Sequence, residues 1–381
     1  MQENLDDLIS ISREYGSDSR WVIAGGGNTS LKSGDILYVK ASGFPLATID
    51  QEGFVRMDRT KLAAIWEKTY PDGEDKASVA HRERLVLADM MASRMPGEER
   101  RPSVEAQLHD LLPWPLVVHL HPTLVNGLTC ALDGETIAAE IFGDSQMWIE
   151  MTDPGYVLAK KIRNRLADKS SRGLSNPDFI LLANHGVFVG GRDRDEVRTK
   201  YKQLDQKLIS LVRRLPDKAP ADAPLPAETK ALEMAARRFF GDQAEILFVR
   251  GGELDRFLTT AENARVLTGC FTPDHIVYAG PGALYLEESG NDPAAAWIRD
   301  GQEYAERWGK SANVVLLPEH SGALLAAADG KALANVKLLL NNALDVAAYT
   351  ESFGGPAMLD ERFVRFIVEW EVENYRSRMA T

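Results

Sequence analysis

The chain alternates short apolar runs with longer segments in which apolar residues recur every three or four positions. The short runs predict strands, and the periodic segments predict amphipathic helices. In the first part of the chain, strands are expected near residues 20–24, 29–33, 35–40, 53–57, 115–121, 178–183 and 186–190. Helices are expected near residues 2–15, 58–68, 76–94, 103–111, 153–168 and 193–214. This alternation is typical of an α/β protein.

A stretch rich in proline, alanine and aspartate interrupts this pattern and predicts a linker over residues 216–228. We therefore expect two domains, at residues 1–215 and 229–381. The second domain is expected to be a smaller α/β unit whose role the sequence leaves open. Its elements are expected near 228–239 (helix), 244–249 (strand), 270–290 (short strands), 293–309 (helix), 313–317 (strand), 327–350 (helix) and 359–375 (helix).

Composition places the chain among ordinary globular proteins. Its 381 residues are 44% hydrophobic and 26% charged, which is typical of globular domains. The formal net charge is −12 and the sequence has no basic run, so nucleic-acid binding is not expected. Cys130 and Cys270 are the two cysteines. They lie far apart and predict free thiols in a reducing compartment, not a disulfide scaffold.

The N-terminal segment and the apolar runs bear on cellular location. Residues 1–16 are acidic and amphipathic, without the basic and apolar regions of a signal peptide. No run reaches the roughly 20 apolar residues that are needed to span a bilayer. We therefore expect a cytoplasmic protein that has no membrane partner.

Two histidines separated by one residue form the strongest chemical signal. His119 and His121 lie at the end of the apolar run 115–121. If this run is a strand, both side chains project from the same face, because side chains alternate along a strand. His185 follows a second strand-like run, in the turn 184–186. Three imidazoles that leave one coordination position open describe a catalytic zinc site.

A carboxylate accompanies the histidines. Glu105 closes the segment PSVE at residues 102–105, and a carboxylate that is near a metal without binding it is typical of a general base. Ser103 resembles the N-cap of a helix that begins there. Histidines on apolar strands are more often hydrogen-bonded core residues, and the pair alone would be a weak metal signal. Its combination with Glu105 and with a glycine-rich loop favours the metal site.

Two turns of small residues offer groups that bind anions. Residues 25–30 read GGGNTS and residues 40–43 read KASG, each after an apolar run. Glycines leave backbone N–H groups exposed, and concave surfaces of such groups bind phosphate. Neither turn has the spacing of a dinucleotide-binding loop or of a Walker A loop. Either turn alone is a weak signal, because glycine-rich turns are usually structural.

In their order and spacing, these motifs resemble the class II (zinc-dependent) aldolase/adducin family over about residues 1–215. The motifs that carry the resemblance are Gly27–Ser30, Ser42–Gly43, Pro102–Glu105, His119–His121 and Asn184–Gly186. The chain is most similar to rhamnulose-1-phosphate aldolase-like (RhaD-type) proteins, because an IFGD segment is followed by Trp148 and by Pro154–Gly155. The resemblance implies a three-layer α/β/α domain around a central, mostly antiparallel sheet.

The resemblance also implies an activity. Family members cleave ketose 1-phosphates, such as those of rhamnulose and fuculose, to dihydroxyacetone phosphate and an aldehyde through a zinc-stabilised enediolate. Glu105 is then the expected catalytic acid and base. The expected metal ligands are His119, His121 and His185, and the expected substrate or phosphate contacts are Gly27, Asn28, Thr29, Ser42, Gly43 and Ser103. Zn²⁺ is the expected cofactor, with manganese, iron and cobalt left open because imidazole suits several metals.

Several features of the activity stay open at this point. The same metal chemistry supports epimerisation, dehydration or decarboxylation of a sugar or sugar-acid phosphate, and adducin-like relatives are non-catalytic modules. Val104 stands where the family segment has a second hydroxyl, so either one phosphate donor is missing or the anion is bound differently. The bifunctional relatives carry a C-terminal dehydrogenase domain with a dinucleotide-binding loop. No such loop occurs here, so we expect no dehydrogenase activity. The resemblance also implies a small sugar-phosphate substrate and a homo-oligomer.

Overall fold

The computed structural model describes residues 5–73, 75–226, 231–287 and 293–370. Contacts divide the chain into two compact units. The N-terminal unit comprises residues 1–125 and 135–210, and the C-terminal unit comprises residues 126–134 and 211–381. Each unit is built around its own sheet.

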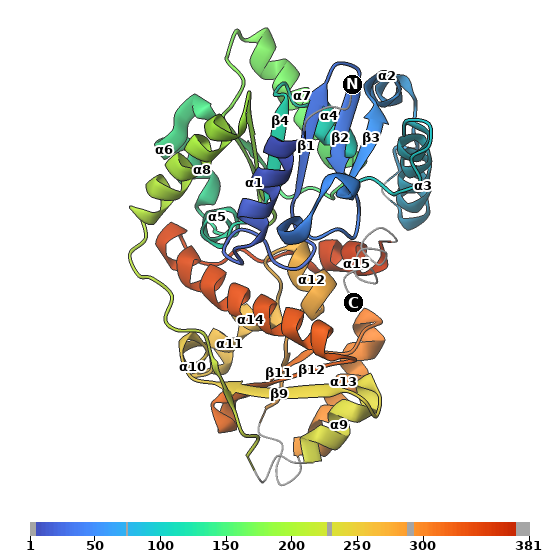
Figure 1. The fold of residues 1–381 in the computed structure, drawn as a ribbon. Coiled ribbons are helices and arrows are strands. Elements are labelled where there is room, and N and C mark those ends of the chain that lie inside the picture. Colours follow the sequence, from blue (N-terminus) through green and yellow to red (C-terminus); the bar gives the residue numbers. More distant parts are fainter. Residues whose placement is uncertain (1–4, 74, 227–230, 288–292, 371–381) are drawn as a thin grey trace. The chain divides into compact units, whose positions relative to one another are not determined.

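The N-terminal unit contains a seven-stranded sheet (Figure 1). In sheet order its strands are β3 (Phe54–Asp58), β2 (Ile36–Lys40), β1 (Asn28–Ser33), β4 (Leu116–Leu120), β7 (Gly186–Gly191), β6 (Phe179–Leu182) and β5 (Gln146–Ile149). All neighbours are antiparallel except β5 and β6, which are parallel. The expectation of a central, mostly antiparallel sheet is therefore confirmed.

Helices cover both faces of this sheet. The helices of this unit are α1 (Asp6–Gly16), α2 (Arg59–Ala64), α3 (Lys76–Ala92), α4 (Ala106–Leu111), α6 (Gly134–Phe142), α7 (Tyr156–Ser171) and α8 (Arg194–Ile209). Helix α5 (Thr123–Thr129) begins in this unit and ends in the C-terminal one. On one face, Val117 and Phe188 of the sheet share a buried apolar cluster with Ile162 of α7. On the other face, Thr29 of β1 contacts α1, and α8 packs on β4 and β7. The unit thus has the expected three layers.

The expected strand at residues 20–24 is not formed. The N–H groups there are used in local turns: Trp21 donates to the carbonyl of Asp18 (2.9 Å) and Gly26 donates to that of Ile23 (3.0 Å). Ala24 has a positive φ of 51°, which no extended strand contains. The apolar side chains of this segment are therefore presented by turns, a possibility that a run of apolar residues does not distinguish from a strand.

Helix α4 begins at Ala106, three residues later than expected, so the prediction of Ser103 as its N-cap is wrong. Ser103 is still paired with the preceding sheet, because its N–H donates to the carbonyl of Lys40 (2.9 Å). A bridge between Ala41 and Pro102 adds to this pairing. Glu105 occupies the N-cap position instead. Helices α5 and α6 were not expected.

The C-terminal unit contains a five-stranded sheet, which confirms a second α/β unit. In sheet order its strands are β10 (Leu284–Tyr285), β11 (Val314–Leu317), β12 (Gly322–Ala327), β9 (Glu245–Arg250) and β8 (Ala221–Ala223). Its helices are α9 (Ala231–Phe240), α10 (Glu253–Phe257), α11 (Ala261–Thr268), α12 (Pro273–Ala279), α13 (Pro293–Trp308), α14 (Gly330–Thr350) and α15 (Glu361–Glu369). Only β10 and β11 are parallel.

Alternating side chains of this second sheet enter two separate cores. Phe248 and Leu324 pack with Trp297 of α13 on one face, and Val249 and Leu325 pack with the α14 side on the other. Strand β12 was not expected, because its sequence GALLAA is buried on both faces and shows no alternation of apolar and polar residues. Of the segment 270–290, where short strands were expected, residues 270–287 contain α12 and the two-residue strand β10. Residues 288–290 lie outside the described residues.

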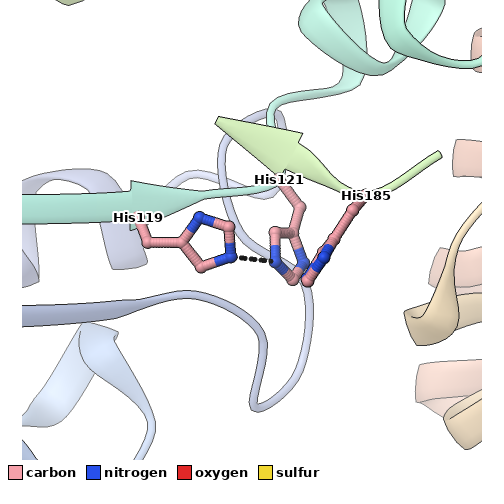
Figure 2. Close-up of side chains that lie close together, drawn as sticks. All are labelled: His119, His121 and His185. Atoms are coloured by element: carbon pink, nitrogen blue, oxygen red, sulfur yellow. Dashed lines mark hydrogen bonds between the residues drawn. The ribbon is translucent and has the colours of Figure 1, made fainter. Parts of the chain in front are cut away.

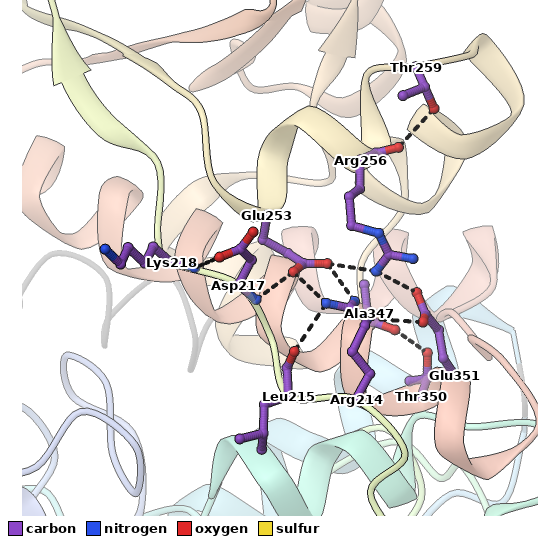
Figure 3. Close-up of polar contacts among 10 residues, drawn as sticks. All are labelled: Arg214, Leu215, Asp217, Lys218, Glu253, Arg256, Thr259, Ala347, Thr350 and Glu351. Carbon is purple, nitrogen blue, oxygen red and sulfur yellow. Dashed lines mark hydrogen bonds and ion pairs between the residues drawn. The ribbon is translucent and has the colours of Figure 1, made fainter.

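A charged cluster ties the start of the C-terminal unit to α10 (Figure 3). The fully buried carboxylate of Glu253 accepts two hydrogen bonds from Arg214 (2.7 and 2.9 Å) and one from the backbone N–H of Asp217 (2.6 Å). Arg256 adds a further bond at 3.1 Å. Paired in this way, a buried carboxylate avoids the large cost of an isolated charge.

The expected linker, 216–228, includes strand β8. Residues 227–228 of that linker lie outside the described residues. The same holds for parts of three expected helices, namely residues 2–4, 228–230 and 371–375. The domain boundaries at 215 and 229 stay a prediction. Among the described residues, no helix combines the length and the hydrophobicity that a bilayer crossing requires.

Candidate metal centre

Two of the candidate ligands come from the end of the central strand β4. The strand is buried along its whole length, as its apolar sequence predicts. His119 is the fourth residue of β4 and is fully buried, and His121 directly follows the strand and is 8% exposed. The spacing of two residues directs both imidazoles to the same side, as expected.

The third candidate, His185, is held by the tight hairpin between β6 and β7. Its N–H donates to the carbonyl of Leu182 (3.2 Å). Asn184 adopts a left-handed conformation with φ of 55°, which asparagine tolerates better than most residues. A Cβ atom at Gly186 would collide with the carbonyl oxygen of Leu120 and lie 2.7 Å from the His121 ring. The conformation of Asn184 and the lack of space at Gly186 therefore explain why these residue types flank His185 in the turn.

The structure brings the three histidines together (Figure 2). One ligating nitrogen from each of His119, His121 and His185 lies within 4.8 Å of the others. The Nε2 atoms of His119 and His121 are 3.0 Å apart. Ligands at about 2.0–2.1 Å around a tetrahedral zinc ion are separated by about 3.3 Å. The donor set therefore fits a metal ion that is bound by three imidazoles.

The orientation of His119 is fixed by two contacts. Its Nδ1 lies 3.1 Å from the carbonyl oxygen of Val187, to which an Nδ1–H group can donate. Its ring stacks on Phe188, with centroids 3.9 Å apart and planes 14° apart. A proton on Nδ1 leaves the lone pair of Nε2 for a metal, which is the usual arrangement of a histidine ligand.

Glu105 lies beside this cluster. Its Oε2 is 3.6 Å from His119 Nε2 and accepts a hydrogen bond from Asn28 Nδ2 at 2.5 Å. Its Oε1 is buried and has no hydrogen-bond partner in the part of the chain that the structure describes. A carboxylate oxygen left in this state is costly unless something else uses it. Glu105 is therefore placed to exchange a proton with a molecule bound at the histidines.

Sequence reasoning missed His109, which completes the surroundings of Glu105. It is fully buried, and its ring lies between two polar side chains of β1: Nδ1 is 2.7 Å from Ser30 Oγ, and Nε2 is hydrogen-bonded to Asn28 Oδ1. Burial lowers the pKa of His109 to about 3. The signal was its position four residues after Glu105, which places the two on adjoining turns of one helix.

The glycine-rich loop lies against the metal-ligand strand. Gly27 has a φ of 65°, and a Cβ atom there would lie 2.9 Å from the carbonyl oxygen of His119. Asn28 pairs with His119 across the sheet, so its side chain faces the site. Thr29 points to the opposite face, where its hydroxyl lies 2.7 Å from Ser12 Oγ. The structure therefore places the Thr29 side chain away from the histidines.

The second turn and the PSVE segment lie side by side. The N–H of Ser42 donates to the carbonyl of Arg101 (2.9 Å), and its Oγ donates to that of Pro102 (3.1 Å). Gly43 follows with a φ of 87°. Ser103 Oγ accepts a hydrogen bond from the N–H of Glu105 (3.3 Å). These residues are near Glu105 as expected, and their contacts with a phosphate stay a prediction.

A comparison with protein families identifies the family of this chain. The family described as the class II aldolase and adducin N-terminal domain matches residues 6–208, which is more than half of the chain. This range contains every candidate site residue.

Individual relatives share part of the chain. The "Uncharacterized oxidoreductase YuxG" of Bacillus subtilis (strain 168) is 28% identical over 222 residues, which are 56% of this chain and 29% of that protein. The chain thus spans less than a third of that relative. An N-terminal class II aldolase domain from Thermoplasma acidophilum has 26% identity, a TM-score of 0.47 and coverage of 56% of this chain and 95% of that chain. The l-fuculose-1-phosphate aldolase of Thermus thermophilus has 18% identity, a TM-score of 0.31 and coverage of 54% and 91%.

Proposed function

This chain belongs to the class II aldolase and adducin family, and from that premise we propose that it is a metal-dependent aldolase. Its proposed reaction is the reversible cleavage of a ketose 1-phosphate, of the rhamnulose or fuculose type, to dihydroxyacetone phosphate and an aldehyde. One observation carries the proposal: three imidazole nitrogens within 4.8 Å of one another lie beside a buried carboxylate whose Oε1 has no partner among the described residues.

We propose His119, His121 and His185 as the ligands of a divalent ion, Zn²⁺ in the first place. When bound there, such an ion would supply a Lewis acid to the carbonyl and hydroxyl oxygens of the triose. The full burial of His119 keeps this side of the site dry, which strengthens electrostatic interactions inside it. Stacking on Phe188 limits rotation of the His119 ring.

Glu105 is the proposed acid and base. During condensation its Oε1 takes a proton from the triose carbon that becomes the nucleophile. During cleavage the same oxygen returns a proton to that carbon after the carbon–carbon bond has broken. Asn28 keeps Oε2 engaged by a hydrogen bond, so the two oxygens have different tasks. We assign no residue to the hydroxyl proton of the aldehyde half.

The phosphate is expected at the two small-residue turns. Ser42, Gly43 and Ser103 come from segments that pair with each other next to Glu105. Gly27 contributes backbone to the same region. The side chains of Asn28 and Thr29 are already hydrogen-bonded to protein groups, so we expect the loop to bind phosphate through backbone N–H groups.

Exchange of deuterium into dihydroxyacetone phosphate, followed by NMR, tests the proposal without knowledge of the aldehyde. We expect exchange at the reactive carbon with metal-loaded protein, and loss of exchange after treatment with a chelator. Glu105→Gln should retain the metal and slow exchange by about 10²–10⁴-fold, which is the usual contribution of general acid–base catalysis.

The other outcomes separate the alternatives. No exchange with metal-loaded protein would reject dihydroxyacetone phosphate as the donor and favour an epimerase, dehydratase or decarboxylase that uses the same residues. Absence of bound metal in the purified protein would favour a non-catalytic, adducin-like module. A nearer likeness to rhamnulose-1-phosphate aldolases, a homo-oligomeric assembly and a cytoplasmic location stay predictions.

A further inference from the structure

A line of four polar side chains leads from the sheet to the carboxylate of Glu105. Ser30 Oγ lies 2.7 Å from His109 Nδ1, His109 Nε2 is hydrogen-bonded to Asn28 Oδ1, and Asn28 Nδ2 lies 2.5 Å from Glu105 Oε2. Ser30 and His109 are fully buried, and Asn28 and Glu105 are 7% and 6% exposed. Such burial makes each unmade hydrogen bond expensive.

The chemistry of the groups fixes the direction of every bond in this line. An ionised carboxylate only accepts, so Asn28 must turn its NH₂ group toward Glu105 and its oxygen toward His109. His109 must then carry its proton on Nε2. Its Nδ1 is left as an acceptor for the hydroxyl of Ser30. One arrangement of protons therefore satisfies all three hydrogen bonds of the line.

We propose that His109 is a positioning residue for Glu105, acting through Asn28. By donating to the amide oxygen of Asn28, His109 holds that amide in the one orientation that donates to Glu105 Oε2. This contact fixes the carboxylate and leaves Oε1 as the oxygen that meets the substrate. The inference rests on the proposed function only in giving Glu105 the proton-transfer step.

Two further observations agree with a positioning role. Burial lowers the pKa of His109 to about 3, so the ring is neutral near pH 7 and has the one donor and one acceptor that the line requires. Phe188 contacts two histidines of the site: it stacks on His119 with ring centroids 3.9 Å apart, and it makes a T-shaped contact with His109 with centroids 5.5 Å apart. His109 and the candidate ligand His119 are thus packed on one aromatic ring.

The inference predicts the consequence of removing the His109 donor. In His109→Phe the amide of Asn28 loses the contact that distinguishes its oxygen from its nitrogen. The amide can then turn its oxygen toward Glu105, where two acceptors repel each other. His109→Gln keeps an N–H at about the reach of the imidazole Nε2. The glutamine variant should therefore retain the orientation of Asn28.

The test compares both variants in deuterium exchange into dihydroxyacetone phosphate. We expect His109→Phe to lower kcat by about 10–100-fold, the size that a small misplacement of a catalytic group produces, with KM and metal content unchanged. We expect His109→Gln to recover most of that loss. Equal loss in both variants, or loss of metal from a folded His109→Phe protein, would assign a merely structural role to His109.

A second readout stands without any activity. Nitrogen-15 NMR of the wild-type protein should show the His109 proton on Nε2, and Asn28→Leu should shift the resonance of that proton. A proton on Nδ1 would overturn the inference whether or not the protein exchanges deuterium. If the wild type shows no exchange but has the expected tautomer, the proposed function fails while the positioning line stands. If His109→Phe does not fold, the glutamine variant and the tautomer decide.

Discussion

The sheets of the two units share one strand arrangement, although only one of them carries the candidate metal ligands. Along the N-terminal sheet the order β1-β4-β7-β6-β5 has antiparallel neighbours up to a final parallel pair. Along the C-terminal sheet the order β8-β9-β12-β11-β10 has the same directions and the same order in the chain. The N-terminal sheet adds β2 and β3.

The two units are also alike in one hairpin, β6–β7 or β11–β12, and in the helix that follows it, α8 or α14. The loops of both hairpins contain a residue other than glycine with a positive φ: Asn184 in one and Ser321 in the other. Both hairpins lead to a long helix that is capped by an aspartate, Asp193 for α8 and Asp329 for α14. A Cβ at Gly186 or at Gly322 would meet a carbonyl oxygen of the adjacent central strand, β4 or β9.

The side chains at matching positions differ. Strand pairing places Phe248 of β9 where β4 has His119, and Arg250 where the chain has His121. Ala223 of β8 pairs with Phe248 as Asn28 pairs with His119. A phenylalanine ring and an arginine do not ligate metal ions. The comparison teaches that strand order, hairpin and capped helix serve as a scaffold on which a few side chains decide the chemistry.

The largest expected difference between the two units is the effect of a histidine substitution on bound metal. We expect one bound divalent ion per chain in the purified protein, with almost complete loss in His119→Ala, because two imidazoles hold an ion much less tightly than three. His320→Ala is the matched control in the hairpin loop of the C-terminal unit and should keep the ion. Elemental analysis of both variants checks this. A second equivalent of metal, or metal retained by His119→Ala, would break the comparison.

The two matched glycines should have similar effects on stability and different effects on function. Gly186→Ala and Gly322→Ala each force a methyl group against a packed neighbouring strand. We expect each to lower the free energy of unfolding by about 2–3 kcal/mol. Only Gly186→Ala displaces His121, so it should also weaken metal binding by about 10–100-fold. Urea unfolding measures the two stabilities, and metal titration measures the two affinities for the ion. Equal metal affinities of the two variants would contradict the comparison.

The smallest expected effect concerns two buried histidines. Burial lowers the pKa of His109 to about 3 and that of His275, in the C-terminal unit, to about 4. Unfolded histidine titrates near 6.5, so between these values the unfolded chain binds more protons than the folded one. The contribution of these neutral histidines to the free energy of unfolding is therefore fully present above pH 6.5. It is lost as the pH falls from 6.5 toward the pKa of the folded state.

At pH 5 each of these histidines should lower the free energy of unfolding by about 2 kcal/mol relative to pH 7.5. This value corresponds to about 1.36 kcal/mol for each pH unit below 6.5. His109→Gln and His275→Gln should each remove that share of the acid sensitivity when urea unfolding is measured at both pH values. The two substitutions should act alike on stability. Replacement by phenylalanine should slow deuterium exchange at His109 and leave it unchanged at His275.

Much of the candidate site could be predicted because its signals are local. A spacing of two residues on a buried strand directs His119 and His121 to one side, whatever surrounds the strand. The order of the motifs placed Glu105 and His185 in the same site. His109 was missed because nothing in its local sequence indicates that it meets Asn28, which lies on a distant strand.

Some local signals were misread for a physical reason. Apolar residues near 20–24 are buried in turns, and an apolar run has the same composition whether turns or a sheet satisfy its N–H groups. Ser103 has the residue type of an N-cap, but its backbone is held by the carbonyl of Lys40. Thr29 lies in a loop that is expected to bind phosphate; the alternation of β1 turns its side chain to Ser12, and a phosphate contact of Thr29 stays a prediction.

By itself, the sequence determined the type of most elements, the resemblance to a family and the residues that offer metal-binding nitrogens, because periodicity and residue chemistry are local properties. Only the tertiary structure decided which of these residues meet. Strand pairing sets Asn28 opposite His119, and helix packing brings His109 and Glu105 to the amide of Asn28. The tertiary structure also revealed the shared strand order of the two units, since pairing between distant strands leaves no periodic trace in the sequence.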